Sequence, residues 1–472
     1  MSLQSASALA LTLILLLFAI AAIVEARSGA LAKRPRLRHA TYTLALGVYC
    51  TSWTFYGAVG SAVRDGWSYL PIYAAPIVLL LAAPKFLRRL SEAVADEQAT
   101  TVSDFIAARF SHDIVVARLV TVTALLGTIP YLALQLRSIG GALSIVTAND
   151  VSEPAMLVAA PLLALFAILF GVRRFEVAGR SEGLLYAIGV ESAIKLLALL
   201  AVAGVAVAVI AVAPADQIAN GTAELRERFR VDQLSIDVAV IFFLSMTAII
   251  ALPRQFYMGL VEARRPDDLV RARGGLALYL AVMAALVIPI ALAGSMVFGP
   301  DISPDLYVLQ LPAGEGYGMV LAAALLGGVS AAASMTIAET TALSTMISND
   351  LVFPTMVRGP IARSGAVGRR MLTVRRQSIV LIMIAATGWA LLVSPRQSLA
   401  SIGLVAFAAM AQFTPHLLLA ATGKGRDPLA ARASLSVGLA LWIYTLGLPP
   451  VLPTEWLGAL SGSFADPLRL LG

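Results

Sequence analysis

The chain contains about a dozen apolar stretches, each close to the length of a helix that crosses a lipid bilayer. A hydrocarbon core about 30 Å thick is spanned by roughly 20 helical residues. Runs of this length must be helical, because lipid offers no hydrogen-bond partners to open backbone groups. The 472 residues are 59% hydrophobic and 13% charged, with a mean hydropathy of +0.84, which is too apolar for a soluble domain. We predict an all-α membrane protein with about 12 transmembrane helices, in contact with lipid and not an enzyme.

Breaks at charged, proline and glycine residues separate the apolar runs. The predicted spans lie near residues 6–24, 40–62, 67–87, 114–147, 154–171, 183–213, 236–260, 274–298, 316–348, 377–394, 398–421 and 433–450. The segment 92–113 is expected to form a short amphipathic helix, with Thr101 among its cap candidates.

Basic residues predict the orientation of these spans. If the first span runs inward, 27 of the 35 lysines and arginines fall on the inner side, with Arg254 counted in the basic loop after the seventh span, and 6 on the outer side, as in membrane proteins generally. Both termini are then outside, in a multi-pass protein of the bacterial inner membrane. The net charge of +7 reflects this topology, so we expect no nucleic-acid partner. Cys50, the single cysteine, excludes an intrachain disulfide.

Polar interruptions within spans are candidate binding sites, because transporters hold solutes near the midplane at broken helices. In the second span, residues 47–60 combine small, hydroxylic and aromatic side chains. A tight helix contact through Gly57 and Gly60 explains this run equally well. In the seventh span, Ser245 is followed by Pro253, which frees a backbone carbonyl or simply kinks the helix.

Charges within spans are costly and are functional candidates by default. Glu339, in the polar ninth span, is such a candidate, although it could also pair near the inner surface. Glu191 and Lys195 stand four residues apart and are expected to neutralise each other on one helix face. Arg137, near Gln135 in the fourth span, could extend outward, bind a substrate carboxylate or pair with another helix.

Four segments together resemble the sodium/solute symporter family: residues 47–60, 101–110, 252–255 and 348–351. Residues 49–57 and 129–137 look most like the transporter module at the N-terminus of CbrA-type sensor histidine kinases. The resemblance covers nearly the whole chain. It implies LeuT-like inverted five-helix repeats with extra flanking helices. The expected parts are an N-terminal helix and basic loop (1–39), the first repeat (40–214), an outside loop with the second repeat (215–421), and a further helix with an outside tail (422–472).

The resemblance also implies where solute and ion bind. Tyr49, Trp53 and Gly57 match the substrate-helix positions of the proline transporter, and polar span positions complete the set. The predicted substrate-binding residues are Tyr49, Trp53, Gly57, Gln135, Arg137 and Ser245.

For the ion, the resemblance implies two carbonyls of the first repeat helix and three positions of the ninth span. The matching residues are Gly47, Cys50, Ala331, Ser334 and Met335. Met335 departs from the family pattern, because a thioether is a poor ligand for a hard cation, and Tyr49 stands where the proline transporter has a carboxylate. We therefore expect no cofactor, a degenerate Na⁺ site at best, and coupling to H⁺ or only weakly to Na⁺ with Glu339 titrating.

Two functions fit these features. The first is secondary active transport (symport) of an amino acid or similar small nutrient, with histidine as the first candidate from the resemblance. The second is a solute-sensing input module for signal transduction, with a cytoplasmic histidine kinase or response regulator as partner and slow or vestigial transport. An ion channel fits less well, because no span carries a filter repeat. Sensor-kinase relatives continue through one more span, so we expect either a transporter-only form or a fragment.

Overall fold

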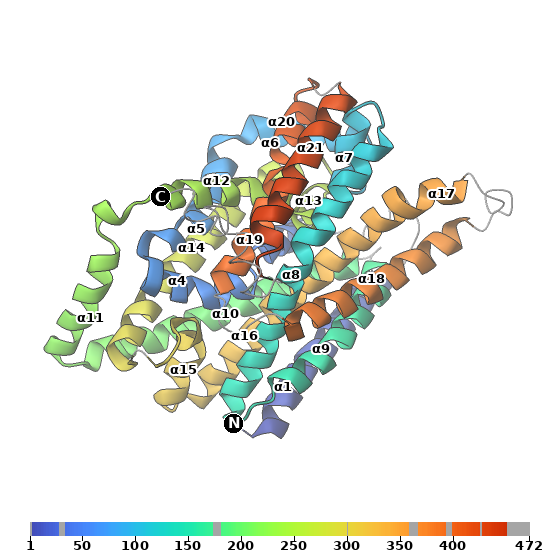
Figure 1. Ribbon diagram of the computed structural model, residues 1–472. Helices are drawn as coiled ribbons and strands as arrows, with labels where there is room; N and C mark the ends of the chain where they lie inside the picture. Colours follow the sequence, from blue (N-terminus) through green and yellow to red (C-terminus); the bar gives the residue numbers. More distant parts are fainter. Residues whose placement is uncertain are drawn as a thin grey trace.

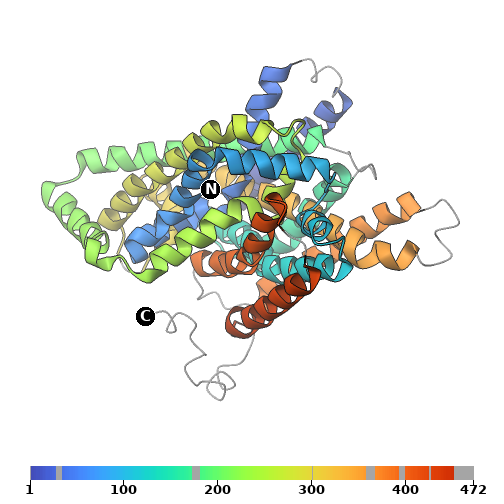
Figure 2. The same cartoon turned by 90° about the horizontal axis from the view of Figure 1, so that it is seen from above.

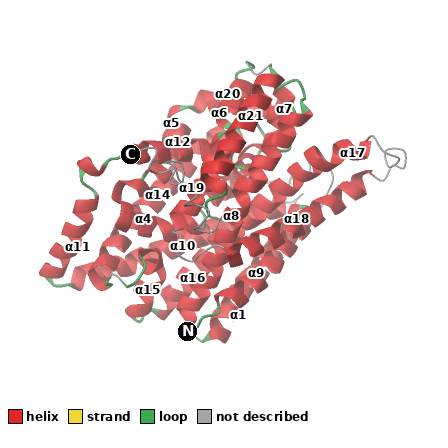
Figure 3. Ribbon diagram, in the orientation of Figure 1, coloured by secondary structure: helices red, strands yellow, loops and turns green. Residues whose placement is uncertain are grey.

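A computed structural model describes residues 2–27, 34–172, 181–299, 301–357, 367–392, 399–424 and 427–450. Within these ranges every regular element is a helix and no strand occurs (Figure 3). The prediction of an all-α membrane protein is therefore confirmed.

The helices differ widely in length. The long ones are α1 (Leu3–Ala26), α8 (Ile114–Thr147), α9 (Ser152–Phe166), α10 (Glu182–Val212), α12 (Ile236–Ala251), α14 (Asp268–Val297), α16 (Gly318–Met346), α18 (Val367–Leu392), α19 (Leu399–Ala411) and α21 (Pro428–Trp442). The shorter ones are α3 (Pro35–Ala45), α4 (Ala58–Asp65), α5 (Pro71–Ala82), α6 (Pro84–Asp96), α7 (Val102–Arg109), α11 (Ala215–Arg228), α13 (Pro253–Phe256), α15 (Tyr307–Gly314), α17 (Phe353–Val357) and α20 (Thr414–Ala421). Short 3-10 turns are Leu46–Tyr49, Gly66–Tyr69, Val231–Gln233 and Pro304–Leu306, and π-helical turns are Trp53–Gly57, Ala167–Gly171, Tyr257–Val261, Ile347–Val352 and Ile443–Gly447.

The described part of the chain has eight helices that are long and apolar enough to cross a membrane, or up to eleven when each of three bent pairs counts as one span. We predicted about twelve. The difference arises in the predicted span 40–62, which is two short pieces rather than one helix. Its inner piece is too short to cross alone, and its outer piece joins α5 in a pair bent by 56°.

Helices α10 and α16 pack closely at the centre of the molecule, with α8 alongside (Figure 1). The approach depends on small residues, as is usual between membrane helices. A Cβ added at Gly327 would lie 2.5 Å from the Cβ of Ala198 on α10, and one at Gly328 would lie 1.7 Å from the Tyr56 hydroxyl. The α17–α18 pair and α11 lie at opposite ends of the molecule in both views (Figures 1 and 2).

Two helices are interrupted near this centre. The 3-10 turn Leu46–Tyr49 ends at Cys50, whose backbone is extended (φ −79°, ψ 109°), and helix resumes at Trp53. Leu252 is likewise extended (φ −63°, ψ 132°) between α12 and α13, because Pro253 cannot donate the hydrogen bond that would continue α12. The sequence marked both runs as candidate interruptions, with a tight helix contact and a simple kink as the alternatives, and the structure has an extended residue at each, with a 48° bend at the second.

The segment 92–113 is helical in two pieces rather than one. α6 continues to Asp96, and α7 begins after Thr101, whose hydroxyl accepts a 3.0 Å hydrogen bond from the Asp104 amide. Thr101 is thus a helix cap as predicted.

Candidate functional site

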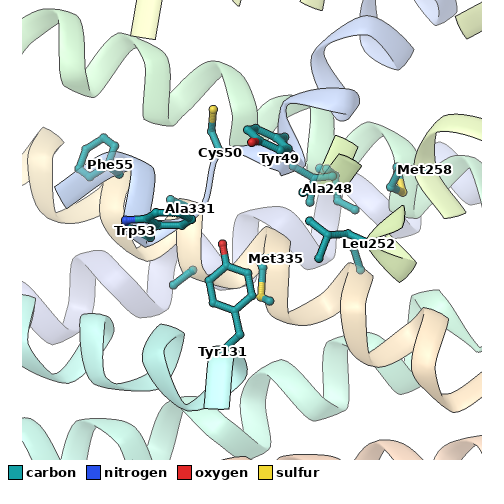
Figure 4. Packing of buried hydrophobic residues seen from close by; sticks show 14 of the residues in the cluster. Tyr49, Cys50, Trp53, Phe55, Tyr131, Ala248, Leu252, Met258, Ala331 and Met335 are labelled. Carbon is teal, nitrogen blue, oxygen red and sulfur yellow. The ribbon is translucent and has the colours of Figure 1, made fainter. Parts of the chain in front are cut away.

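The two breaks face each other in the interior of the bundle. Figure 4 shows Tyr49, Cys50 and Trp53 at the first break and Leu252 at the second. The facing side chains come from α8 and α16 and include Tyr131, Ala331 and Met335. The Trp53 ring packs edge-on against Phe407 of α19, with 5.2 Å between centroids, so α8, α16 and α19 surround the breaks.

Polar side chains of α8 compensate the first break. The Gln135 amide oxygen accepts hydrogen bonds from the Ser52 amide (3.2 Å) and the Ser52 hydroxyl (2.8 Å), and Ser138 bonds the same hydroxyl at 2.9 Å. Thr51 and Tyr131 share a 2.9 Å bond between hydroxyls. Buried backbone groups freed by a break must find such partners. Gln135, predicted to bind substrate, here holds the broken helix.

The second break places a charged pair in the interior. Arg254 and Glu339 form an ion pair with 2.9 Å between Nη1 and Oε2, and both side chains are 0% exposed. Thr128 also bonds Glu339, at 3.4 Å, and the guanidinium lies over the Tyr131 ring, 5.0 Å from its centroid. This corrects our sequence assignment of Arg254 to the inner basic loop. The sequence signal for this interior position was an arginine directly after a proline that breaks a span.

Several buried donors in this region have no hydrogen-bond partner among the described residues. They are Arg254 Nε and Nη2, the Trp53 indole nitrogen, and the Ser245 hydroxyl, which lies close to the Tyr49 phenol. A buried donor left unpaired costs about 1–3 kcal/mol. These atoms are therefore suited to receive a polar ligand.

Lys195 of α10 has a role that the sequence did not reveal. Its ammonium donates to the carbonyl oxygens of Gly47 (2.7 Å) and Cys50 (2.6 Å), and the side chain is fully buried. The predicted ion pair with Glu191 does not form, because the ammonium is drawn to the break, and the Glu191 carboxylate oxygens have no hydrogen-bond partner among the described residues.

A sodium site does not fit these residues. Both carbonyls expected as ligands, those of Gly47 and Cys50, already accept bonds from Lys195. The Ser334 hydroxyl bonds Ala331 of its own helix at 3.3 Å, and Met335 offers only sulfur to a cation that prefers oxygen. The arrangement holds a lysine ammonium where the resemblance implied a metal ion.

The other predicted residues lie at the edge of the cluster or outside it. The Tyr49 hydroxyl donates to the carbonyl of Ile72 at 2.9 Å. Gly57 ends the buried π-helical turn that begins at Trp53. Arg137 Nε donates to the Ala390 carbonyl on α18 at 3.0 Å, so this guanidinium points away from the breaks.

The two ends of the bundle differ. On the side predicted to face the cytoplasm, a cleft of about 760 Å³ lies between α6, α7, α18 and the turns Tyr257–Val261 and Ile347–Val352. On the opposite side, Arg64 of α4 and Asp305 pair at 2.9 Å. The Asp305 carboxylate fits there because Gly60 has no side chain, since an added Cβ would lie 1.7 Å from its Oδ1. The bundle is thus held together by an ion pair at one end and contains a cleft at the other.

Comparison with solved structures finds the same architecture in membrane transporters. A Na⁺-coupled sialic acid symporter, in a substrate-bound outward-open state, matches with a TM-score of 0.63 and 13% identity, covering 93% of this chain and 96% of the other. A manganese transporter of Eremococcus coleocola matches with a TM-score of 0.52 and 11% identity, covering 92% of this chain and 90% of the other. No family profile and no curated protein matches the sequence. The chain therefore has the fold of membrane transporters.

Proposed function

We propose that the protein is a secondary active transporter of a small solute that carries a carboxylate, an amino acid in the first instance. One observation carries this proposal: Arg254, fully buried at the second break, has two nitrogens, Nε and Nη2, without a hydrogen-bond partner among the described residues. A guanidinium offers paired donors that match a carboxylate. The site lies where broken helices of transporters bind solutes.

The neighbouring groups suit an amino acid. Trp53 supplies a large buried ring and an N–H without a hydrogen-bond partner among the described residues, which complements an apolar or aromatic side chain such as that of histidine. Ser245 adds a hydroxyl close to Tyr49. Inverted five-helix repeats and the alternating access that such repeats perform are part of the same proposal.

The ion pair suggests how a proton couples to the solute. A substrate carboxylate bound at Nε and Nη2 of Arg254 brings a second negative charge beside Glu339, which is paired with the same guanidinium through Nη1. Two carboxylates that share one site favour the protonated form of one of them. Solute binding would thus favour a proton on Glu339, so that one proton accompanies the solute.

Binding and transport are separate measurements. Purified protein would be screened by calorimetry against the common amino acids and then tested for uptake in proteoliposomes under a proton gradient. Arg254→Gln should lose solute binding, and the matched control Arg137→Gln should retain it, because Arg137 faces α18. Equal affinity in both variants would remove Arg254 from the site. Tight binding without uptake would favour the alternative, a solute-sensing input module for a histidine kinase.

A further inference from the structure

The cation position at the first break is filled by the protein itself. Unwound carbonyls at broken helices coordinate Na⁺ in transporters, and here Gly47 and Cys50 supply such carbonyls. Both accept bonds from the Lys195 ammonium, at 2.7 and 2.6 Å. An ammonium is a compact monovalent cation with three donors, so it supplies the charge that a sodium ion would bring.

The surroundings of Lys195 keep its ammonium at the first break. The side chain is 0% exposed, and it reaches the break from α10, a helix that packs against α3, α14 and α16. The titratable groups that act on it are Cys50 at the break, Glu191 on its own helix and Arg254 on α13. Tyr279 of α14 bonds the Ser192 carbonyl instead.

We propose that the Lys195 ammonium is a built-in cation that replaces sodium at the broken helix, so that solute binds without a sodium ion. The statement about the solute rests on the proposed function. The statement about the cation rests on the geometry at Lys195 alone. Two unit charges about 4 Å apart repel strongly in a protein interior, which would weaken sodium binding about a thousandfold while Lys195 is present. Met335 is a second, independent obstacle, because it lacks the oxygen that Na⁺ prefers.

The first test needs no solute. Thermal unfolding would be measured in NaCl and in choline chloride of equal ionic strength, since a ligand of the folded state raises Tm. We expect equal Tm in both salts for the natural chain and for Met335→Thr. Lys195→Ala should be less stable and specifically stabilised by NaCl, and Lys195→Ala with Met335→Thr more so. Lys85→Ala, a lysine of α6 outside the site, is the matched control and should respond to neither salt.

The opposite results overturn the inference. A sodium-specific rise in Tm for the natural chain, or for Met335→Thr alone, would show that sodium binds beside Lys195. If Lys195→Ala does not fold, the solute affinity of the natural chain is compared in NaCl and in choline chloride. A change in affinity of more than about tenfold between the two salts contradicts the inference. If no solute binds, the proposed function is rejected. The Tm comparison still tests the cation inference, because it uses no solute.

Discussion

Arg254 and Glu339 connect the second broken helix to α16 through an ion pair 2.9 Å long that neither solvent nor lipid reaches. The guanidinium uses one nitrogen for this pair and rests on the Tyr131 ring. Its other nitrogens have no partner among the described residues. The pair thus connects two helices, and its guanidinium has donors left that can bind an anion.

Removing one partner of this pair should destabilise the protein strongly. Arg254→Met leaves Glu339 without a cation, and breaking a buried pair costs about 3–5 kcal/mol. We expect a clearly lower Tm in detergent for Arg254→Met. Adding Glu339→Leu should recover much of the loss, because no buried charge is then left over. A double variant as unstable as the single one would show that the charge itself is not the cause.

Glu339→Gln should flatten the pH dependence of uptake, because an amide cannot take up the proton when solute binds Arg254. Uptake would be measured in proteoliposomes from pH 5.5 to 8.5. Glu191→Gln is the matched control, as Glu191 is a buried carboxylate of α10 outside the pair, and it should keep the natural profile. An unchanged profile for Glu339→Gln would make that residue structural.

Trp53→Ala should abolish solute binding while the protein still inserts and folds. Trp53→Phe keeps one ring near Phe407 but removes the indole N–H and part of the ring area, so we expect an intermediate affinity, at least about tenfold weaker than natural because one hydrogen bond is lost. Calorimetry with the solute identified by screening gives both affinities. Equal affinity for Trp53→Ala and the natural chain would place the solute elsewhere.

Gly60→Ala should open the end of the bundle that Arg64 and Asp305 close. The added Cβ would lie 1.7 Å from Asp305 Oδ1 and 2.8 Å from Arg64 Nη2, so the pair must separate. With Ser61→Cys as a reporter on α4, labelling by an impermeant thiol reagent should become several times faster. Gly204→Ala on α10 meets no atom within 4 Å and should leave the labelling rate unchanged.

Asp113 gives a pH-dependent contribution to stability at the start of α8. A hydrogen bond from Arg432 lowers the pKa of Asp113, with further help from the amides of Val116 and Val115. A lowered folded-state pKa stabilises the protein above the unfolded value of about 3.9 and is lost as pH falls through the folded value. Arg432→Gln should therefore lower Tm slightly at pH 7, and the difference from the natural chain should shrink below about pH 4. A difference that persists at low pH would point to lost packing of the Arg432 side chain instead.

Local patterns were sufficient for much of the architecture. Apolar runs predicted the helices, Pro253 and the polar run 47–60 marked the two candidate interruptions, and Thr101 was identifiable as a cap. Each depends on residues within a few positions of one another, because helix formation and capping are local. The span 40–62 was drawn as one helix because hydropathy does not register an extended residue such as Cys50.

The site was less accessible from the sequence. Gln135 and Arg137 of α8 were predicted to bind the solute, and in the structure Gln135 bonds Ser52 and Arg137 bonds the Ala390 carbonyl of α18. Lys195 and Glu191 satisfied the spacing of a helical ion pair, and only the packing of α10 against the break offers Lys195 better partners. Arg254 followed a proline near a basic loop, where its charge resembled the loop arginines.

The sequence by itself thus determined which segments are helices and marked the two runs in which breaks occur. The tertiary structure alone decided which charge meets which: Lys195 with the carbonyls of Gly47 and Cys50, Arg254 with Glu339, Arg64 with Asp305. The physical reason is that a charge buried in an apolar interior is costly unless it is paired, and these partners lie 85 to 241 positions away in the chain. Such distances are bridged only when the helices pack.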